Sequence, residues 1–388
     1  MTKMWLPDLQ LFQRPEIVEL MWGHPDLRLL PVSEFLEATQ VALEHDGPVA
    51  LSYGAEQGPG CLIEQVCARL GRLEGGAPPP EQTMITGGVS QALDMLCTLL
   101  TQPGDVALVE SPTYHLALRV LRDHGLECVP VPCDDEGLRV DGLEEVLASL
   151  RRQGRRARLL YLVPTFNNPT GVTLKAERRE ALVALAEREG LMVLEDDVYR
   201  ELWYDSPPPP PLYSLSPGGS VVRLGSFSKV LAPGLRLGWM LARPDIVRRC
   251  IGSGMLDSGG GVNHFTGHVV AAFIELGLLD RQVEVLRASY RQRREALLDG
   301  LARHLPEGCR WTRPGGGFFI WLRLPPGMDG AALLPLAESA GVSYVPGARF
   351  YTNAGGEEYC RLAFTLVPLE QLAEGARRLG VALCEWKP

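Results

Sequence analysis

The stretch Ser226-Phe227-Ser228-Lys229, followed closely by Arg236, combines two kinds of chemistry in one short segment. A lysine attacks a carbonyl group only when its amine is partly deprotonated, and a nearby cation or a desolvated pocket favours that neutral form. Small hydroxyl groups and a planar guanidinium suit a different task, because they hold a phosphate by short hydrogen bonds and a bidentate fork. A polar turn with a surface lysine is the alternative interpretation, and the rest of the chain has to decide between them.

An imine-forming amine beside a phosphate clamp matches the needs of pyridoxal phosphate (PLP), an aldehyde that carries a phosphate group. A second phosphate-binding segment is expected at Val89 and Ser90, because backbone N–H groups at a helix N-terminus point toward an anion. An ordinary strand-to-helix turn is the alternative there, since the preceding loop is neither a Walker nor a GxGxxG loop. Tyr53 lies in a glycine-rich loop that is either a plain connector or the source of a phenol for the phosphate.

Polar side chains recur where strand-like runs end. Tyr114 follows the run 106–110 and is placed to stack on a flat ring, although a lone tyrosine is more often core or surface. Asn168, held extended before a proline, can donate to a phenolate oxygen. Asp196 ends an apolar strand, where a carboxylate makes sense if it faces a buried cation such as a protonated ring nitrogen. A solvent-exposed carboxylate or a salt bridge is the alternative for Asp196.

Two further residues are candidates for contact with a substrate. Arg361 lies in the apolar run 360–364, where a buried arginine needs a partner, and a substrate carboxylate would be a good bidentate one. A structural salt bridge is the alternative for Arg361. His24 sits in a turn-forming cluster and is either a turn residue or a substrate contact.

The elements that position these residues alternate between strands and helices from about 83 to 240. This order predicts an α/β fold, with a mostly parallel mixed sheet flanked by helices and a smaller α+β domain after about 280. We expect residues 1–45 to form an arm and a helix capped by Ser33 that belong to the small domain. Residues 46–280 would form the large, cofactor-binding domain, and residues 281–388 the small C-terminal one.

Composition narrows the class of protein. The 388 residues carry a formal net charge of −9, which argues against nucleic-acid binding. The first residues lack the long apolar core of a signal peptide, and no apolar run approaches the roughly 18 residues that cross a membrane, so we expect a cytoplasmic protein. The nine cysteines are scattered singly and predict reduced thiols, with neither a disulfide frame nor a metal site.

Five motifs in order resemble the fold-type I PLP enzymes, in particular the class I/II aminotransferases. These motifs are Asn168-Pro169-Thr170-Gly171, Asp196-x-x-Tyr199, Ser226-x-Ser228-Lys229, Gly234-x-Arg236-x-Gly238 and Cys360-Arg361-Leu362. The resemblance covers nearly the whole chain. Within the class, the chain is most similar to the branch of 2-aminoadipate and multi-substrate aminotransferases and the effector domains of MocR-type regulators.

The resemblance implies a role for each matching position. Lys229 would form the internal aldimine and then move the proton between Cα and the cofactor, while Arg361 would bind the substrate α-carboxylate. The family are homodimers, so Tyr53 would reach in from a second subunit. The other cofactor contacts would be Asp196 at the pyridinium nitrogen, Tyr199 and Asn168 at the phenolate oxygen, Tyr114 on the ring, and Val89, Ser90, Ser226, Ser228 and Arg236 at the phosphate.

The expected function is therefore a PLP-dependent aminotransferase that moves an amino group between a 2-amino acid and a 2-oxo acid, with 2-oxoglutarate as acceptor. The pocket wall, which we expect to include His24, Tyr53 and residues 259–263, favours aliphatic or aromatic 2-amino acids. Arg28 is a candidate for binding a second carboxylate. A PLP-dependent C–S lyase or decarboxylase is an alternative that uses the same residues. A non-catalytic, PLP-binding effector domain is another.

Overall fold

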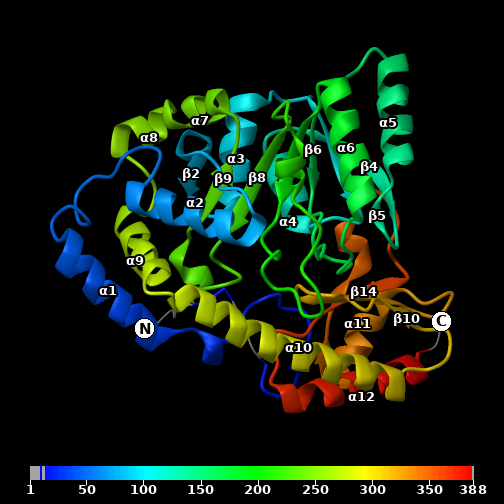
Figure 1. Ribbon diagram of the computed structural model, residues 1–388. Coiled ribbons are helices and arrows are strands. Elements are labelled where there is room, and N and C mark those ends of the chain that lie inside the picture. Colours follow the sequence, from blue (N-terminus) through cyan, green and yellow to red (C-terminus); the bar gives the residue numbers. More distant parts are fainter. Residues whose placement is uncertain (1–8, 11–13, 387–388) are drawn as a thin grey trace, which may run out of the picture.

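The computed structural model describes residues 9–10 and 14–386, and its largest element is a twisted sheet (Figure 1). Its strands are β2 (Thr83–Thr86), β3 (Val106–Ser111), β4 (Glu127–Asp134), β5 (Gly137–Leu138), β6 (Ala157–Leu162), β7 (Met192–Asp196), β8 (Val221–Ser226) and β9 (Gly238–Leu241). They lie in the order β2-β9-β8-β7-β6-β3-β4-β5. The run from β8 to β4 is parallel, whereas β9 is antiparallel to both β2 and β8. The predicted mostly parallel sheet is confirmed.

Helices cover both faces of this sheet, which explains why its central strands are apolar throughout. Alternate side chains of β3 point to opposite faces. Val106 and Leu108 pack with the two helices α5 and α6, and Ala107 and Val109 pack in the core that contains α3 and α4. The helices of this part are α2 (Gly60–Glu74), α3 (Val89–Leu100), α4 (His115–Asp123), α5 (Val140–Arg152), α6 (Ala176–Glu189), α7 (Pro244–Ile251), α8 (Gly254–Gly259) and α9 (His264–Glu275).

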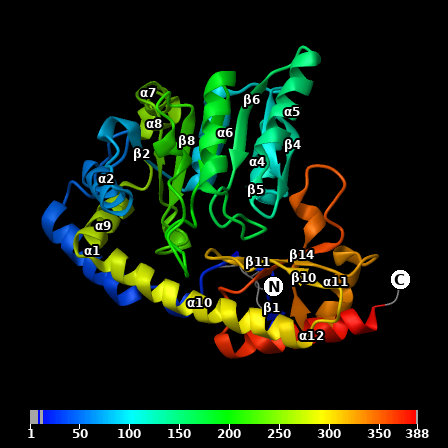
Figure 2. The ribbon, with the colours of Figure 1, turned by 45° about the vertical axis from the view of Figure 1, so that its right-hand side comes forward.

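A smaller unit of antiparallel strands lies beside the large sheet and is joined to it by α10 (Leu278–His304), which Figure 2 shows running beneath both. Its strand order is β10 (Arg310–Trp311), β11 (Phe319–Arg323), β14 (Tyr359–Ala363) and β13 (Val345–Pro346). A parallel pair, β1 (Val18–Glu19) and β12 (Val342–Ser343), adds the N-terminal arm to this unit. Two helices, α11 (Gly330–Ser339) and α12 (Leu369–Glu385), complete it.

The first long helix, α1 (Val32–Asp46), packs against α9 of the large unit. Its N-cap is Pro31 and no side chain caps it, so the prediction that Ser33 caps this helix is wrong. The helix begins earlier because the carbonyl of Pro31 already accepts a hydrogen bond from the Phe35 N–H, which places Ser33 inside the first turn. The proposed division at residues 45 and 280 remains a prediction.

Short 3-10 helices occur at Leu27–Leu29, Pro80–Gln82, Leu212–Leu215, Pro233–Leu235 and Gly347–Phe350.

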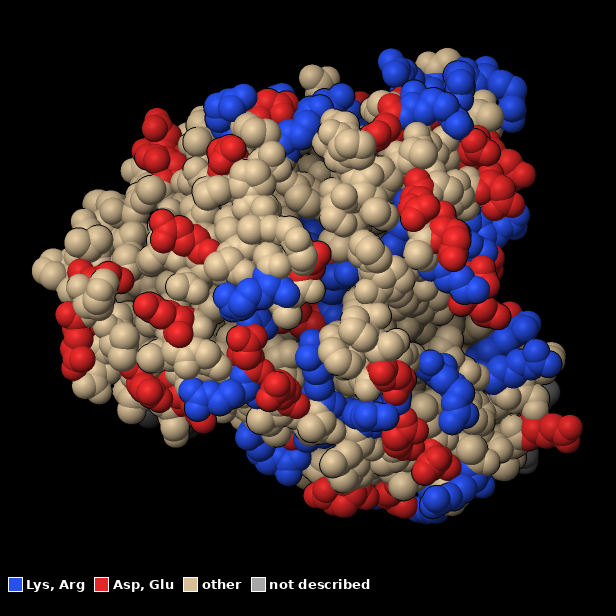
Figure 3. Space-filling view, viewed as in Figure 1, with Lys and Arg blue, Asp and Glu red and all other residues tan. Residues whose placement is uncertain are grey.

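Charges of both signs are interspersed on the face drawn in Figure 3. Basic side chains gather at its upper right, over the C-terminal end of α5, where the sequence carries the arginine residues of the segment 151–156. Two of them pair with carboxylates of the same chain, Arg151 with Glu189 and Arg155 with Glu127. Among the described residues, none of the helices combines the length and the apolar character needed to pass through a bilayer.

Candidate active site

The carboxyl ends of β3, β6, β7 and β8 meet at one edge of the large sheet, because parallel strands point the same way. Asn168 follows β6, Asp196 ends β7, and Lys229 follows β8. Arg361 comes from β14 of the small unit and reaches the same place, where its Nη1 donates to Oδ1 of Asn168 at 3.0 Å. The two units of the fold therefore contribute to one site.

The amine of Lys229 is held in this site by few polar contacts. Its Nζ donates to the carbonyl of Gly23 at 3.1 Å and lies 5.3 Å from the centre of the Phe318 ring. Burial lowers the pKa of Lys229 to about 8, the positive charge of Arg361 acts in the same direction, and Asp196 opposes both. A lysine with this pKa carries a substantial neutral fraction near neutral pH, which is the form that attacks a carbonyl.

Asp196 is buried, and only one of its two carboxylate oxygens has a hydrogen-bond partner among the described residues. Its Oδ2 accepts a hydrogen bond from the hydroxyl of Tyr161 at 2.6 Å, whereas its Oδ1 has no hydrogen-bond partner among the described residues. Burial raises the pKa of Asp196 to about 6, and the Tyr161 hydrogen bond and the charge of Lys229 counteract it. A buried carboxylate oxygen without a partner is costly, so this atom fits a cationic donor such as a protonated ring nitrogen.

The contact of Tyr161 with Asp196 was not predicted from the sequence, where β6 has the pattern of a buried structural strand. In the parallel pair β6–β7, Tyr161 lies opposite Leu194, two residues before Asp196. Residues two apart on a strand share a face, so Tyr161 and Asp196 point the same way. Only the register of the two strands, which comes from the folded sheet, reveals this pairing.

The acidic residues on either side of Asp196 have structural partners. Glu195 accepts hydrogen bonds from the backbone N–H groups of Leu212 and Tyr213. Asp197 pairs with Arg223, whose Nε lies 2.9 Å from Oδ2. Asp196 is the member of this acidic run without a salt-bridge partner among the described residues.

Arg361 is buried without a carboxylate partner among the described residues. Its Nη2 donates to the carbonyl of Met21 at 2.7 Å, and its guanidinium carbon lies 4.3 Å from the centre of the Phe319 ring. Burial lowers the pKa of Arg361 to about 10. Among the described residues, the polar partners of Arg361 are an amide oxygen and a backbone carbonyl, and the salt bridge considered as the alternative is not formed. Tyr199 is also buried, and burial raises the pKa of its phenol well above the usual range.

The N-terminus of α3 faces the loop that carries Arg236. Gly88, the N-cap, has φ 90°, and a Cβ there would lie 3.2 Å from Nη2 of Arg236. Arg236 itself has φ 47°, an unusual conformation for a residue with a side chain. Among the described residues, its guanidinium donates only to the backbone carbonyls of Pro233 and Gly87, so it remains available to an anion. Val89 and Ser90 form the first turn of α3 here.

The two serines of the lysine segment lie close together, since the Ser228 N–H donates to Oγ of Ser226 at 3.1 Å. Asn263 was predicted to line the pocket wall, but its side chain has a different contact. Its Nδ2 donates to the carbonyl of Arg236 and so supports the strained backbone of that residue.

Four other candidates, His24, Tyr114, Tyr53 and Arg28, differ in their positions. Burial lowers the pKa of His24 to about 4, and the positive charges of Lys229 and Arg361 act in the same direction. Burial raises the pKa of Tyr114 to about 12, and Asp196, Arg361 and Arg236 are the charges that act on it. Tyr53, in contrast, is 88% exposed. Arg28 is paired with Asp26 by a 2.7 Å ion pair.

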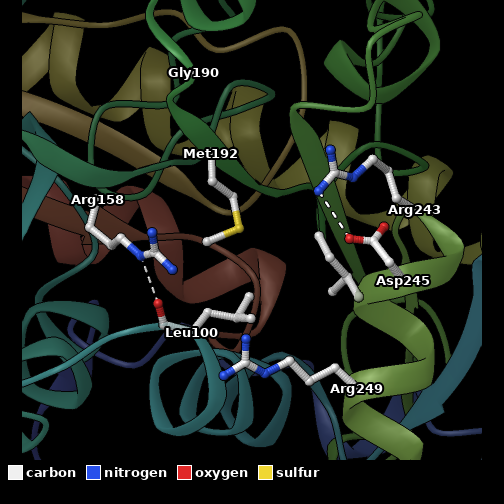
Figure 4. A pocket seen from close by; sticks show the side chains of 8 residues that line it. Leu100, Arg158, Gly190, Met192, Arg243, Asp245 and Arg249 are labelled. Atoms are coloured by element: carbon white, nitrogen blue, oxygen red, sulfur yellow. Dashed lines mark hydrogen bonds and ion pairs between the residues drawn. The ribbon is translucent and has the colours of Figure 1, made fainter.

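A cavity at the opposite edge of the sheet is separate from this site. It has a volume of about 280 Å³ and lies where β6 and β7 begin, beside the end of α3 and the start of α7. Figure 4 shows two interactions among the residues that line this cavity. Arg158 donates a hydrogen bond to the carbonyl of Leu100, and Arg243 forms a salt bridge with Asp245. None of the predicted site residues lines this cavity.

A family profile described as "Aminotransferase class I and II" matches residues 17–379. The chain belongs to this family. It is 37% identical to "Aromatic-amino-acid aminotransferase 1" of Thermococcus litoralis over 97% of this chain and 90% of that protein. It is also 37% identical to "2-aminoadipate transaminase" of Thermus thermophilus, over 97% of this chain and 92% of that protein.

A solved structure of Pyrococcus horikoshii kynurenine aminotransferase, in complex with PMP, superposes on this aminotransferase with a TM-score of 0.91. The two chains are 37% identical, and the match covers 95% of this chain and 91% of that one. More distant matches include proteins described as HTH-type transcriptional regulators. The predicted family, fold, enzyme class and cofactor, a PLP-dependent aminotransferase of fold type I, are confirmed.

Proposed function

We propose that this aminotransferase moves an amino group between a 2-amino acid with an aliphatic or aromatic side chain and a 2-oxo acid, with 2-oxoglutarate as the acceptor. The observation that carries the proposal is Arg361, a buried guanidinium that has no carboxylate partner among the described residues and lies near Lys229. A cation in that position suits the carboxylate that every 2-amino acid and 2-oxo acid carries.

The bound coenzyme supplies an electron sink for the bond broken at the substrate Cα. Asp196 would accept a hydrogen bond from the protonated ring nitrogen at its unpartnered Oδ1. Tyr199 and Asn168 would hydrogen-bond the ring oxygen, and Tyr114 would stack on the ring. The phosphate would be held by the N–H groups of Val89 and Ser90, the hydroxyls of Ser226 and Ser228, and the guanidinium of Arg236.

Lys229 would have two tasks, to hold the coenzyme covalently and to move a proton. Its Nζ, with a pKa lowered to about 8, can accept the proton that leaves the substrate Cα and return it later. Positioning of the reacting groups would supply the remaining rate enhancement, because Arg361 would hold the substrate carboxylate and the phosphate contacts would hold the coenzyme.

The preference for uncharged side chains is supported by the state of Arg28. This arginine is already paired with Asp26 and is therefore a poor partner for a second substrate carboxylate. His24, whose pKa is lowered to about 4, is neutral at pH 7 and would form part of a pocket wall without positive charge.

We further propose that the enzyme is a homodimer in which Tyr53 binds the phosphate of the partner's coenzyme. Tyr53 lies among other exposed apolar side chains in α1 and the segment after it. Several exposed apolar side chains in one short part of the chain favour an interface. The exposed apolar residues of this surface are Val32, Leu36, Val49, Leu51 and Tyr53.

The test of the reaction is a panel of amino donors added to the coenzyme-loaded enzyme, read as the spectral change of the first half-reaction, and then 2-oxoglutarate to reverse it. Phenylalanine and leucine should react faster than aspartate, and Lys229→Ala should react with none of them. Release of pyruvate and ammonia from a cysteine conjugate, without any 2-oxo acid, would instead support the C–S lyase.

A further inference from the structure

Three side chains with metal-binding atoms converge at a point outside the active site. Asp46 is the last residue of α1, Cys61 lies in the first turn of α2, and His268 lies on α9. Nδ1 of His268 is 3.6 Å from Sγ of Cys61 and 2.5 Å from Oδ2 of Asp46, and the three ligand atoms lie within 4.8 Å of one another. Figure 1 shows these three helices grouped at one end of the molecule.

We propose that Asp46, Cys61 and His268 form a site for a divalent transition metal of the zinc type. Thiolate and imidazole ligands select such ions over Mg²⁺ and Ca²⁺, which prefer oxygen atoms alone. One thiolate and one carboxylate also neutralise the two positive charges of the ion, which suits a site where His268 is 7% exposed.

The distances fit tetrahedral coordination with one adjustment. For a tetrahedral zinc ion, a sulfur and a nitrogen ligand stand about 3.6 Å apart and a nitrogen and an oxygen ligand about 3.4 Å apart. The first value matches the observed distance between Sγ and Nδ1. The second requires the Asp46 carboxylate to move outward from its hydrogen bond with His268, and its side chain is 26% exposed and so has room.

The arrangement does not suit a cysteine nucleophile. In a catalytic triad the nucleophile and the carboxylate face opposite nitrogens of the histidine, so that a proton can pass through the ring. Here Cys61 and Asp46 both face Nδ1 of His268. A bound metal would displace the thiol proton of Cys61 to solvent.

The metal would restrict the movement of both ends of the segment that carries Tyr53. Asp46 and Cys61 flank residues 47–60, and α9 already contacts the start of this segment through His264, whose Nε2 lies 3.0 Å from the carbonyl of Val49. This consequence rests on the proposed role of Tyr53 at the partner's phosphate, whereas the metal site does not.

The site is tested by titrating Co²⁺ into coenzyme-loaded enzyme that has been treated with a chelator. One Co²⁺ per chain should bind and give the strong absorption in the red that tetrahedral cobalt shows, a region where the coenzyme does not absorb. Cys61→Ser and His268→Gln should each weaken binding by more than about 10-fold, because loss of even a supporting contact costs that much. Cys128→Ser, which removes another half-buried free thiol, should bind Co²⁺ as the unaltered enzyme does.

A second measurement needs no variant. Zn²⁺ should slow alkylation of Cys61 by iodoacetamide, read by peptide mass spectrometry, while the exposed Cys384 reacts at an unchanged rate. Absence of the tetrahedral cobalt spectrum, or the same spectrum and affinity in Cys61→Ser, would overturn the proposal. If Co²⁺ binds as expected but leaves the dissociation constant of PLP unchanged, only the link to Tyr53 is overturned.

Discussion

Tyr161 donates its hydroxyl to Oδ2 of Asp196 at 2.6 Å, and this bond leaves Oδ1 as the buried oxygen without a partner. The tyrosine thus orients the carboxylate and stabilises its charged form at the same time. Because burial alone pushes the pKa of Asp196 up, the hydrogen bond helps to keep that carboxylate ionised at neutral pH.

Tyr161→Phe should weaken coenzyme binding at low pH. The pKa of Asp196 in the coenzyme-free enzyme is about 6, so affinity for PLP should fall as the pH drops through that value and the carboxylate takes up a proton. Without the hydrogen bond the pKa rises, and the fall should begin at higher pH. A fluorescence titration of PLP at several pH values measures the shift.

Tyr213→Phe is the matched control, because Tyr213 also donates to a side chain, Gln82, but lies outside the site. An identical pH profile for Tyr161→Phe and the unaltered enzyme would show that Tyr161 does not act on Asp196.

Arg361→Lys should lower kcat/KM for the amino acid donor by about tenfold or more, since one charge-assisted hydrogen bond contributes ~1.5 kcal/mol or more. Lysine keeps the charge but loses the planar fork. Single-turnover reaction with phenylalanine measures the loss. Arg323→Lys, in the neighbouring strand β11, removes an exposed arginine and should leave the rate unchanged. Equal rates for the two variants would rule out the proposed carboxylate contact.

A chain that lacks the Tyr53 side chain and a chain that lacks the Lys229 amine should regain activity when they form a mixed dimer. Tyr53→Ala and Lys229→Ala chains, each of low activity, are mixed, dissociated and reassociated. In the mixed dimer, one site receives an intact Lys229 from one chain and an intact Tyr53 from the other, so activity should reappear. If the phenol acts within its own chain, mixing restores nothing, and light scattering on the unaltered enzyme independently reports whether it is a dimer.

Lys229 should react as an amine of lowered pKa. In the coenzyme-free enzyme, the rate of its reductive methylation by formaldehyde should rise with pH and level off above about 8, because burial favours the neutral form. Peptide mass spectrometry follows each lysine separately. The exposed Lys175, which pairs with Glu136, controls for the pH dependence of the reagent. A Lys229 profile that coincides with that of Lys175 contradicts the lowered pKa.

The strands and the residues at their carboxyl ends were predictable because local patterns define them. An apolar run followed by Asp196 or by Ser226 to Lys229 identifies both a strand and its functional end, and parallel strands bring such ends together. The predicted roles of these side chains follow from their types and from the family motifs, and remain to be tested.

Contacts between segments far apart in the chain could not be predicted in the same way. Tyr161 looked like one more apolar residue of a buried strand, and Asn263 like part of a glycine-rich loop. Cys61 has no second cysteine or histidine at a metal-binding spacing, so the scattered thiols were interpreted as reduced thiols that form neither a disulfide frame nor a metal site. Only the packing of α1 and α2 on α9 brings Cys61 to His268, 207 residues later.

The most direct test of the account is to find where the coenzyme is attached. The coenzyme-loaded enzyme is reduced with borohydride, which fixes any lysine-bound coenzyme, then digested and analysed by mass spectrometry. We expect the added mass on the peptide that contains Lys229, and its absence after treatment with an amino acid donor before reduction. Attachment at Lys175, or no attachment at all, would contradict the assignment of Lys229 as the reactive amine.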